Sequence, residues 1–420
     1  MITKSKLLIS KSIHSLFQKG FFHLLTALVA GQGFAFILKL ILGRWLTNED
    51  FSRYNFIIET NTLLATFMTL ALPTAMMRFG IKEKRLEYYF GGSIRLFTGL
   101  SFIVLTIFYI IKLQKNFFND AVTNYFLWYT VLLAPSFAFF NYITAFLSSA
   151  KKAKERGWLV LGQRISYFVF LIAGCKVALW SGTIIGYTLF SVFLMLFLIL
   201  KYKKHIFVSC QGFPYKRILT FTIWDSIHKI GAAIIPFLIL PFSQQILGNL
   251  THISYYTMAF SFVVIAKFSF ASINDLIFPY LAEKSNKKDF IHFLGKVLLL
   301  MGIIALGVIV VSYMIVPFII TSLLGVKYMG AIPIFKLIIL GEVVIGVSIL
   351  FEMILEILGV VRFKAWSILV NLAIFIVTTP FLLQNYGIFG AAYSFILFST
   401  IRIAFNTAGV LIFINKLKID

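Results

Sequence analysis

Apolar residues recur along the chain in continuous runs of about 20 residues, separated by short polar segments. Only helices and closed barrels pair every backbone polar group inside a bilayer. Because the runs do not alternate between polar and apolar residues, they favour helices over a barrel. About twelve spans are predicted. Their approximate boundaries are 20–43, 54–79, 88–111, 121–148, 157–179, 183–200, 218–247, 251–281, 291–323, 330–358, 365–384 and 388–415.

The composition agrees with a membrane protein. The 420 residues are 60% hydrophobic and only 13% charged, whereas a soluble domain carries about 25% charged residues. A soluble fold could not bury so much apolar surface. We therefore predict an all-α polytopic membrane protein.

The basic residues predict its orientation. With the N-terminus inside, the inner segments hold about 23 Lys and Arg and the outer loops about five, which places both termini in the cytoplasm. The net charge of +23 then reflects topology and attraction to anionic lipids, and no nucleic-acid partner is expected. Lys4, Lys6 and Lys11 alternate with isolated apolar residues, which predicts an amphipathic helix on the inner surface rather than a cleaved signal peptide.

The longest connection divides the chain. Residues 201–217 are basic and contain Gly212 and Pro214, and they are predicted to link two six-helix halves, 1–200 and 218–420. Halves with an even number of spans share one orientation, as in parallel repeats around a central cavity. Each half also has a Leu-Thr pair followed by an aromatic residue at the exit of its first span, which indicates a duplicated unit.

Several charges fall inside the predicted spans, where each costs roughly 2.5–3.5 kcal/mol on insertion scales and should therefore face protein or water. The candidate cations of the cavity are Lys39, Arg78, Arg164, Lys229, Lys267 and Arg402. The candidate carboxylates for ion coupling are Glu59, Asp225 and Glu342.

Two other roles for these charges stay open. They can form buried ion pairs, for example Asp225 with Lys229 or Glu342 with Arg402, and Arg78 can anchor to lipid phosphate. Near an inner helix end, two further carboxylates and two cations are expected to pair. These are Glu352, Glu356, Arg362 and Lys364.

No motif for catalysis or for a cofactor is apparent. The two cysteines, Cys175 and Cys210, fall on opposite sides of the predicted membrane, and no Cys/His cluster has the spacing of metal ligands. We expect neither a metal nor a cofactor.

Four segments carry a family resemblance. The first hairpin contains Leu42-Gly43-Arg44, then Phe51 and Tyr54, and ends at Met77-Arg78-Phe79. The later segments are Ile277-Phe278-Pro279-Tyr280-Leu281-Ala282-Glu283, residues 324–333 and residues 386–392. In this order they resemble bacterial polysaccharide and oligosaccharide flippases, of the O-antigen or repeat-unit translocase type. These belong to the multidrug/oligosaccharidyl-lipid/polysaccharide (MOP) exporter superfamily.

The resemblance implies a function. Such a flippase moves an undecaprenyl-pyrophosphate-linked oligosaccharide repeat unit across the bacterial inner membrane by alternating access, for O-antigen, capsule or exopolysaccharide biosynthesis. Its expected partners are this lipid-linked oligosaccharide, membrane lipids, a polysaccharide polymerase and a chain-length regulator. The family offers no catalytic residue to transfer, and we expect no enzyme activity.

Two alternatives remain. A multidrug or cation antiporter of the same fold would favour a surplus of buried carboxylates, whereas the deep cations here outnumber the deep anions. A glycan polymerase or glycosyltransferase that uses a polyprenyl lipid usually needs a sizeable segment outside the bilayer, whereas every loop here is short.

Overall fold

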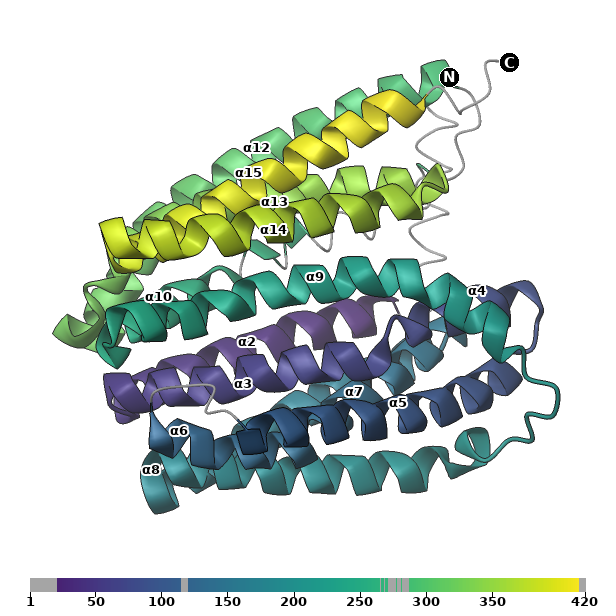
Figure 1. Ribbon diagram of the computed structural model, residues 1–420, viewed down its shortest axis with the longest axis horizontal. Helices are drawn as coiled ribbons and strands as arrows, with labels where there is room; N and C mark the ends of the chain where they lie inside the picture. Colours follow the sequence, from purple (N-terminus) through teal and green to yellow (C-terminus); the bar gives the residue numbers. More distant parts are fainter. Residues whose placement is uncertain are drawn as a thin grey trace. The chain divides into compact units, whose positions relative to one another are not determined.

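Helices make up every regular element that the structure, a computed structural model, describes (Figure 1). The description covers residues 21–114, 120–264, 266–267, 269–270, 277, 281 and 287–414. The predicted surface helix before residue 20 and most of the segment around Phe278 lie outside these residues. The helices of the first part are α2 (Phe21–Trp45), α3 (Asn48–Thr69), α4 (Leu72–Lys82), α5 (Leu86–Gln114), α6 (Ala121–Phe126), η1 (Leu127–Tyr129), α7 (Thr130–Ser149) and α8 (Ala153–Ile206). Those of the second part are α9 (Tyr215–Leu247), α10 (Leu250–Phe262), α12 (Lys287–Ile319), η2 (Ile320–Leu324), η3 (Gly325–Tyr328), α13 (Ala331–Ile357), α14 (Val361–Tyr386) and α15 (Ile388–Phe413).

The predicted class is confirmed. Within the described residues, 10 helical segments are long and apolar enough to cross a membrane. The predicted fifth and sixth spans are the two arms of α8. The predicted eighth span begins as α10, and its remainder lies partly outside the described residues.

Helix α8 folds back on itself at Ala178 and Leu179, where the backbone leaves helical geometry and Leu179 has a φ of 49°. Two glycines let its arms approach closely, because a Cβ on Gly174 would lie 2.1 Å from the carbonyl oxygen of Gly182. Small residues allow such backbone contact between membrane helices. The hairpin explains why two predicted spans form one continuous run of 54 residues.

The second predicted span is broken rather than continuous. Leu70 and Ala71 have φ values of 39° and 53°, a left-handed geometry that costs non-glycine residues about 1–2 kcal/mol each. Pro73 follows in the first turn of α4, where its missing N–H is tolerated. The proline therefore starts a new helix instead of extending α3.

Packing divides the chain into two compact units. Unit 1 comprises Met1–Leu42, Leu64–Lys115 and Phe126–Thr222, and unit 2 comprises Gly43–Leu63, Asn116–Tyr125 and Ile223–Asp420. The end of α2 and most of α3 thus pack with the second part of the chain. In unit 1, α7 packs along α8, α4 and α5, and the rings of Phe90 and Phe146 lie 4.3 Å apart between α5 and α7.

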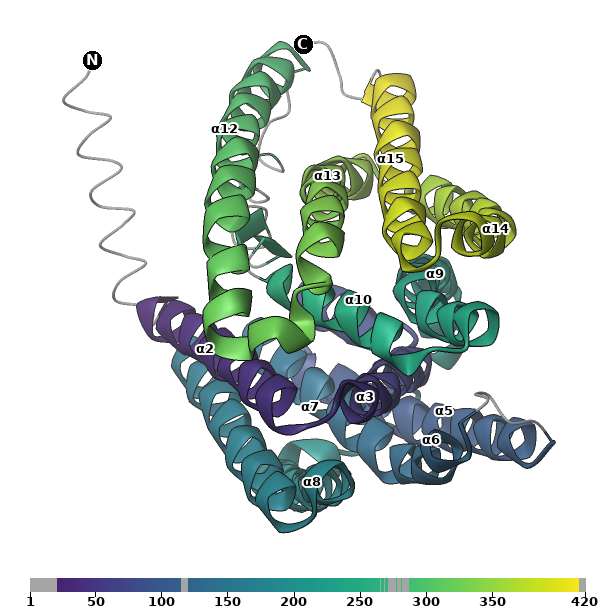
Figure 2. The ribbon, with the colours of Figure 1, turned by 90° about the vertical axis from the view of Figure 1, so that its left-hand side faces the viewer.

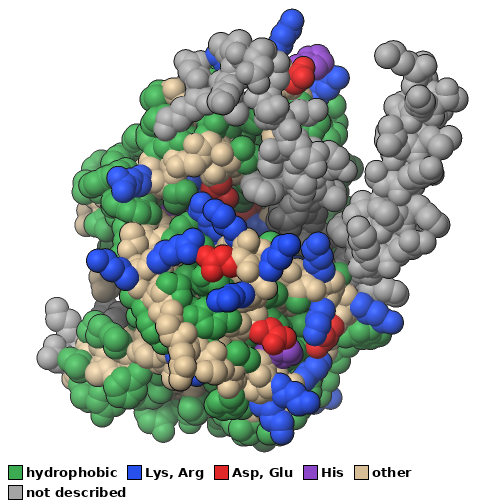
Figure 3. All heavy atoms as spheres, turned by 90° about the vertical axis from the view of Figure 1, so that its right-hand side faces the viewer, with side chains coloured by type: hydrophobic (Ala, Val, Ile, Leu, Met, Phe, Trp, Pro, Cys, Tyr) green, Lys and Arg blue, Asp and Glu red, His purple; other side chains and the backbone are tan. Residues whose placement is uncertain are grey.

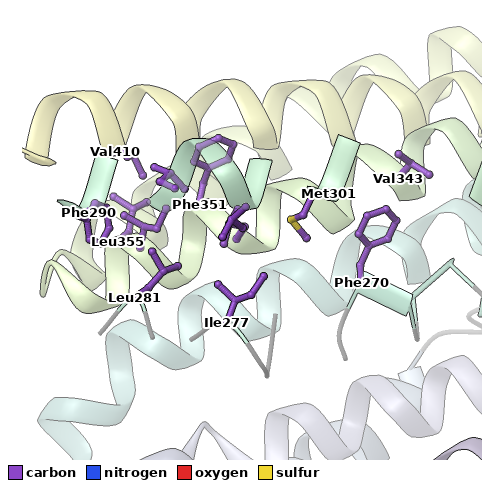
Figure 4. Close-up of a cluster of buried hydrophobic side chains, with 13 residues drawn as sticks. Phe270, Ile277, Leu281, Phe290, Met301, Val343, Phe351, Leu355 and Val410 are labelled. Carbon is purple, nitrogen blue, oxygen red and sulfur yellow. The ribbon is translucent and has the colours of Figure 1, made fainter. Parts of the chain in front are cut away.

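The core of unit 2 forms around α13, which packs along both α12 and α15 (Figure 2). A cluster of buried apolar side chains fills the space between these helices (Figure 4), and it includes Phe290, Met301, Phe351, Leu355 and Val410. Close packing of this kind contributes much of the association of membrane helices, because lipid tails are as apolar as the side chains.

Candidate functional site

A buried ion network joins α9, α13 and α15 in unit 2. Arg402 grips Glu352 with both ends of its guanidinium group, since Nε lies 2.6 Å from Oε1 and Nη2 lies 3.0 Å from Oε2. Asn406 donates a hydrogen bond of 2.8 Å to the same carboxylate. Bidentate pairs of this kind are among the strongest in proteins. The network therefore fixes α15 against α13.

His228 completes the network from α9. Its Nε2 lies 3.3 Å from Oε2 of Glu352, and its Nδ1 lies 3.4 Å from the carbonyl oxygen of Lys364. Both ring nitrogens thus face oxygen atoms, and which nitrogen donates depends on the tautomer of the ring. Glu352 is 6% exposed and His228 is 7% exposed, so the group of charges is buried together.

This network corrects one expected ion pair. One pairing left open for Arg402 was with Glu342, but Arg402 binds Glu352, which was expected to pair with a neighbouring cation at the helix end. The offset of α15 along α13 explains the difference. Asn406, one turn beyond Arg402, donates a hydrogen bond of 2.8 Å to the hydroxyl oxygen of Ser348. The guanidinium group therefore reaches the carboxylate at 352.

Two other expected pairs are confirmed. Asp225 and Lys229, one turn apart on α9, form an ion pair of 2.7 Å. Glu356 accepts a close hydrogen bond from the ammonium group of Lys364. Arg362, by contrast, does not pair with these carboxylates in the described contacts but lies 5.5 Å from the ring centre of Trp224.

Glu342 is a buried carboxylate that takes part in none of the ion pairs described above. It is 3% exposed, and among the described residues its Oε2 has no hydrogen-bond partner. The positive charges of Lys267 and Arg402 act on it through space. The hydroxyl group of Tyr256, equally buried, also lacks a hydrogen-bond partner within the part of the chain that the structure describes, and the charges of Glu59 and Glu342 act on it. The structure thus gathers these charged residues around one region of unit 2.

Lys267, like Lys229, has an exposed side chain in unit 2, but Lys229 is held in an ion pair with Asp225. The ammonium nitrogen of Lys267 lies 4.4 Å from the ring centre of Phe260, a cation–π contact that leaves hydrogen-bond donors available to a ligand. An exposed lysine next to an aromatic ring is suited to hold a charged and a flat group together.

The remaining candidate cations, Lys39, Arg78 and Arg164, lie in unit 1. Lys39 and Arg164 are half-buried, and Arg164 packs against Gly31, whose added Cβ would lie 3.1 Å from its Cγ. Arg78 is exposed, with its guanidinium carbon 4.7 Å from the ring centre of Phe221. A role in binding lipid phosphate and a role in binding substrate both fit this position.

The two units differ in their charges. The acidic residues of unit 1 are Glu83, Glu87 and Glu155 alone, and all three lie at or beside helix ends. Helix α2, which holds Lys39, contains no acidic residue, and the acidic residue of α8, which holds Arg164, is Glu155 at its start. The candidate carboxylates Glu59, Asp225 and Glu342 all belong to unit 2.

Two of the resemblance segments touch each other within unit 2. Lys327 donates a hydrogen bond of 2.8 Å to the carbonyl oxygen of Gly43 and a further close one to that of Leu46. These carbonyls belong to the end of α2 and the following turn, where no next turn of helix satisfies them. The rings of Phe51 and Tyr328 lie 5.9 Å apart in the same region. Lys327 thus caps α2 from the η3 corner.

Replacing Lys327 with Met should destabilise the protein by about 1–2 kcal/mol, because the carbonyl groups of α2 lose a charged donor. Thermal unfolding of the purified protein in detergent measures the effect. Lys336→Met is the matched control, since Lys336 is exposed on α13 and caps no helix in the described contacts. Equal midpoints for the two variants would remove the capping role.

A second network of ion pairs connects the start of α3 with the segment before α6. Nε of Arg53 lies 2.9 Å from Asp120, and Nη1 lies 2.9 Å from Asp50. Burial raises the pKa of Asp120, but hydrogen bonds from Thr123 and Arg53 and the charge of Arg53 outweigh it, so this pKa lies below the ordinary value. Asp120 therefore remains ionised and holds Arg53 in place.

Sequence reasoning missed His228, Asn406 and Lys327. For His228 a signal existed, because a titratable residue within an apolar helix is by default a candidate functional residue. Asn406 follows Arg402 by one turn, and two polar residues on one face of an apolar helix also indicate a buried contact. For Lys327 the sequence offers no such signal, because its partners are backbone carbonyl groups far away in the chain.

Comparisons with known proteins agree with this fold. A family model described as "Polysaccharide biosynthesis protein" matches residues 17–285, while no curated protein sequence matches the chain significantly. The solved structure of the lipid II flippase MurJ, inward closed, has a TM-score of 0.71 at 15% identity and covers 92% of this chain and 87% of its own. An inward-facing multidrug resistance MATE family transporter of the MOP superfamily has a TM-score of 0.69 at 14% identity, with coverages of 90% and 94%.

A third similar structure is a MOP superfamily transporter from Pyrococcus furiosus, described by the reverse polarity of its binding pocket. Its TM-score is 0.64 at 12% identity, and the coverages are 94% of this chain and 95% of that one. These likenesses establish the fold of the MOP superfamily, as the resemblance predicted. Since the family model spans well over half of its length, the chain belongs to the polysaccharide biosynthesis protein family.

Proposed function

We propose that the chain is a flippase for an undecaprenyl-pyrophosphate-linked oligosaccharide repeat unit in the synthesis of a surface polysaccharide. The two six-helix halves, 1–200 and 218–420, would alternate access to a shared central cavity, with the linker 201–217 and both termini on the cytoplasmic side of the inner membrane. The family match over residues 17–285 supports the polysaccharide pathway. The solved structures of similar fold include that of a lipid II flippase, which supports a lipid-linked cargo.

The main support for an anionic cargo is the positive charge within the helices of unit 1. Of the helices that hold Lys39 and Arg164, α2 contains no acidic residue and α8 contains only Glu155, at its start. A pyrophosphate group that leaves bulk water is attracted by positive charge of this kind. Lys39, Arg164 and the exposed Lys267 are each our candidates for contacts with the headgroup, while the prenyl tail stays among the lipids.

Unit 2 supports a separate role in coupling. Of the three candidate carboxylates, Asp225 is paired with Lys229 and Glu59 is half-buried. Glu342 is buried, and one of its oxygens has no hydrogen-bond partner among the residues described. A buried carboxylate that can take up a cation is what ion-driven transport requires. Glu342 is therefore our candidate for coupling to protons or sodium ions.

A deletion strain tests the proposed function. Without the protein, lipid-linked oligosaccharide should accumulate on the inner leaflet and surface polysaccharide should disappear, and both should recover with a plasmid copy. Normal surface polysaccharide together with new sensitivity to cationic drugs would favour the multidrug antiporter instead.

A further inference from the structure

A basic pocket lies in unit 1 on the side of the inner loops. The hollow has a volume of about 540 Å³, and Lys84, Arg85 and Lys152 line it together with Tyr88 and His205. It is formed by the start of α5 and the ends of α7 and α8. Lys and Arg side chains gather on this end of the molecule, which carries α4 and the α8–α9 connection (Figures 1 and 3).

The charge of the basic pocket is positive. The acidic residue that lines it is Glu87. Nδ1 of His205 lies 3.2 Å from Oε1 of this carboxylate. Lys152 lies 3.8 Å from Glu155 but stays largely exposed. Three basic side chains thus face one hollow whose own carboxylate is already engaged, which is suited to an anion.

An apolar groove adjoins this pocket along the chain. It has a volume of about 420 Å³, and Phe97, Phe139, Ile199 and Ile206 line it with Gly99. The charged residue of its lining is Arg95, which donates a hydrogen bond of 3.1 Å to the carbonyl oxygen of Val208. A guanidinium group has five N–H donors, so this single bond leaves others for a ligand.

The pocket and the groove share one structural element, the last turn of α8. His205 lines the basic pocket and the next residue, Ile206, lines the apolar groove. A charged hollow and an apolar furrow therefore lie on either side of the same turn, close to the predicted boundary between the membrane and the cytoplasm. A ligand with a negative head and apolar chains matches both parts at once.

We propose that this composite site binds one anionic phospholipid of the cytoplasmic leaflet. Its phosphate would lie in the basic pocket, and an acyl chain would lie in the groove beside Arg95. Basic pockets between transmembrane helices on the cytoplasmic side recognise acidic lipid headgroups. Such a lipid would be a structural partner distinct from the transported cargo, so the site goes beyond the proposed transport activity.

Binding to the purified protein tests the headgroup contacts. The readout is the shift in thermal unfolding with added phosphatidylglycerol, phosphatidylcholine or inorganic phosphate, at about 0.5 M salt, where the screening length is near 4 Å. We expect stabilisation by phosphatidylglycerol alone. The double variant Lys84→Gln/Arg85→Gln should weaken its apparent affinity by about 10- to 30-fold.

The matched control removes two charges from the same end of α8. Lys203 and Lys204 are exposed and line neither the basic pocket nor the apolar groove, so Lys203→Gln/Lys204→Gln should leave the affinity within about threefold of wild type. Equal losses in both double variants would show unspecific attraction and overturn the site. Equal stabilisation by inorganic phosphate would show a site for a soluble anion and would also overturn it.

A second variant tests the groove without removing charge. A Cβ added at Gly99 would meet nothing within 4 Å, so Gly99→Leu should fold while its side chain enters the groove. We expect it to weaken phosphatidylglycerol binding by about tenfold. The control is Gly302→Leu on α12, where the space is equally open. Unchanged binding in Gly99→Leu would exclude the groove as the place of the acyl chain.

Discussion

Replacing Arg402 with Ala is expected to lower the free energy of unfolding by about 3–5 kcal/mol. The variant would leave Glu352 buried at 6% exposure without its bidentate partner, and the single contact with His228 at 3.3 Å cannot replace two guanidinium hydrogen bonds. The loss arises mainly from the uncompensated carboxylate, because removing one partner of a buried pair costs more than the pair contributes. Thermal unfolding in detergent measures the change.

Two further variants separate this mechanism from simple loss of side-chain packing. Arg362→Ala removes an exposed arginine that lies over Trp224 and should cost less than about 1 kcal/mol. In a double-mutant cycle, Arg402→Met combined with Glu352→Leu should be more stable than the sum of the single effects predicts, by about 0.5–3 kcal/mol. Strict additivity would mean that the two residues do not stabilise each other.

Replacing Arg164 with Gln is expected to reduce glycan export by about 10- to 100-fold at a normal level of protein in the membrane. A charged hydrogen bond to an anion contributes about 1.5–3 kcal/mol, and each 1.4 kcal/mol corresponds to a factor of about ten. Unit 1 offers no deep carboxylate that Arg164 must neutralise, so the loss should fall on the anionic cargo rather than on folding.

Export of surface polysaccharide and immunoblotting of the membrane fraction measure the two quantities together. Lys176→Gln is the matched control in the same helix, since Lys176 is exposed close to the turn of α8 and should export normally. Lys267→Gln in unit 2 should behave like Arg164→Gln if both cations contact the headgroup. Normal export by Arg164→Gln would remove this residue from the binding site.

The sequence predicted the positions of the membrane spans better than the points where their helices are interrupted or turn back. Hydrophobic runs placed the spans, because a bilayer of fixed thickness demands about 20 apolar residues. The second span was predicted as one run, 54–79, whereas the separate helix that begins near Pro73 depends on the left-handed geometry of Leu70 and Ala71. The closure of α8 at Leu179 depends on backbone contact between Gly174 and Gly182, which no hydrophobic pattern encodes.

The charged residues show the same division between local and distant contacts. Asp225 and Lys229 were predictable as a pair, since residues one turn apart share a helix face. The partner of Arg402 was not, because three residues on different helices, Glu352, His228 and Arg402, meet through the relative level of α9, α13 and α15. Lys327 finds its carbonyl partners 284 and 281 residues away, beyond the reach of any local rule.

The most direct measurement of the proposed function is flipping by the purified protein in vesicles. Lipid vesicles containing a pyrophosphate-linked oligosaccharide on one leaflet would receive wild-type or Arg164→Gln protein, and lectin accessibility would report the oligosaccharide on the other leaflet. We predict transfer by wild type, a rate about 10- to 100-fold lower for Arg164→Gln, and no transfer in protein-free vesicles. Equal transfer by wild-type protein and protein-free vesicles would contradict the function proposed for this chain.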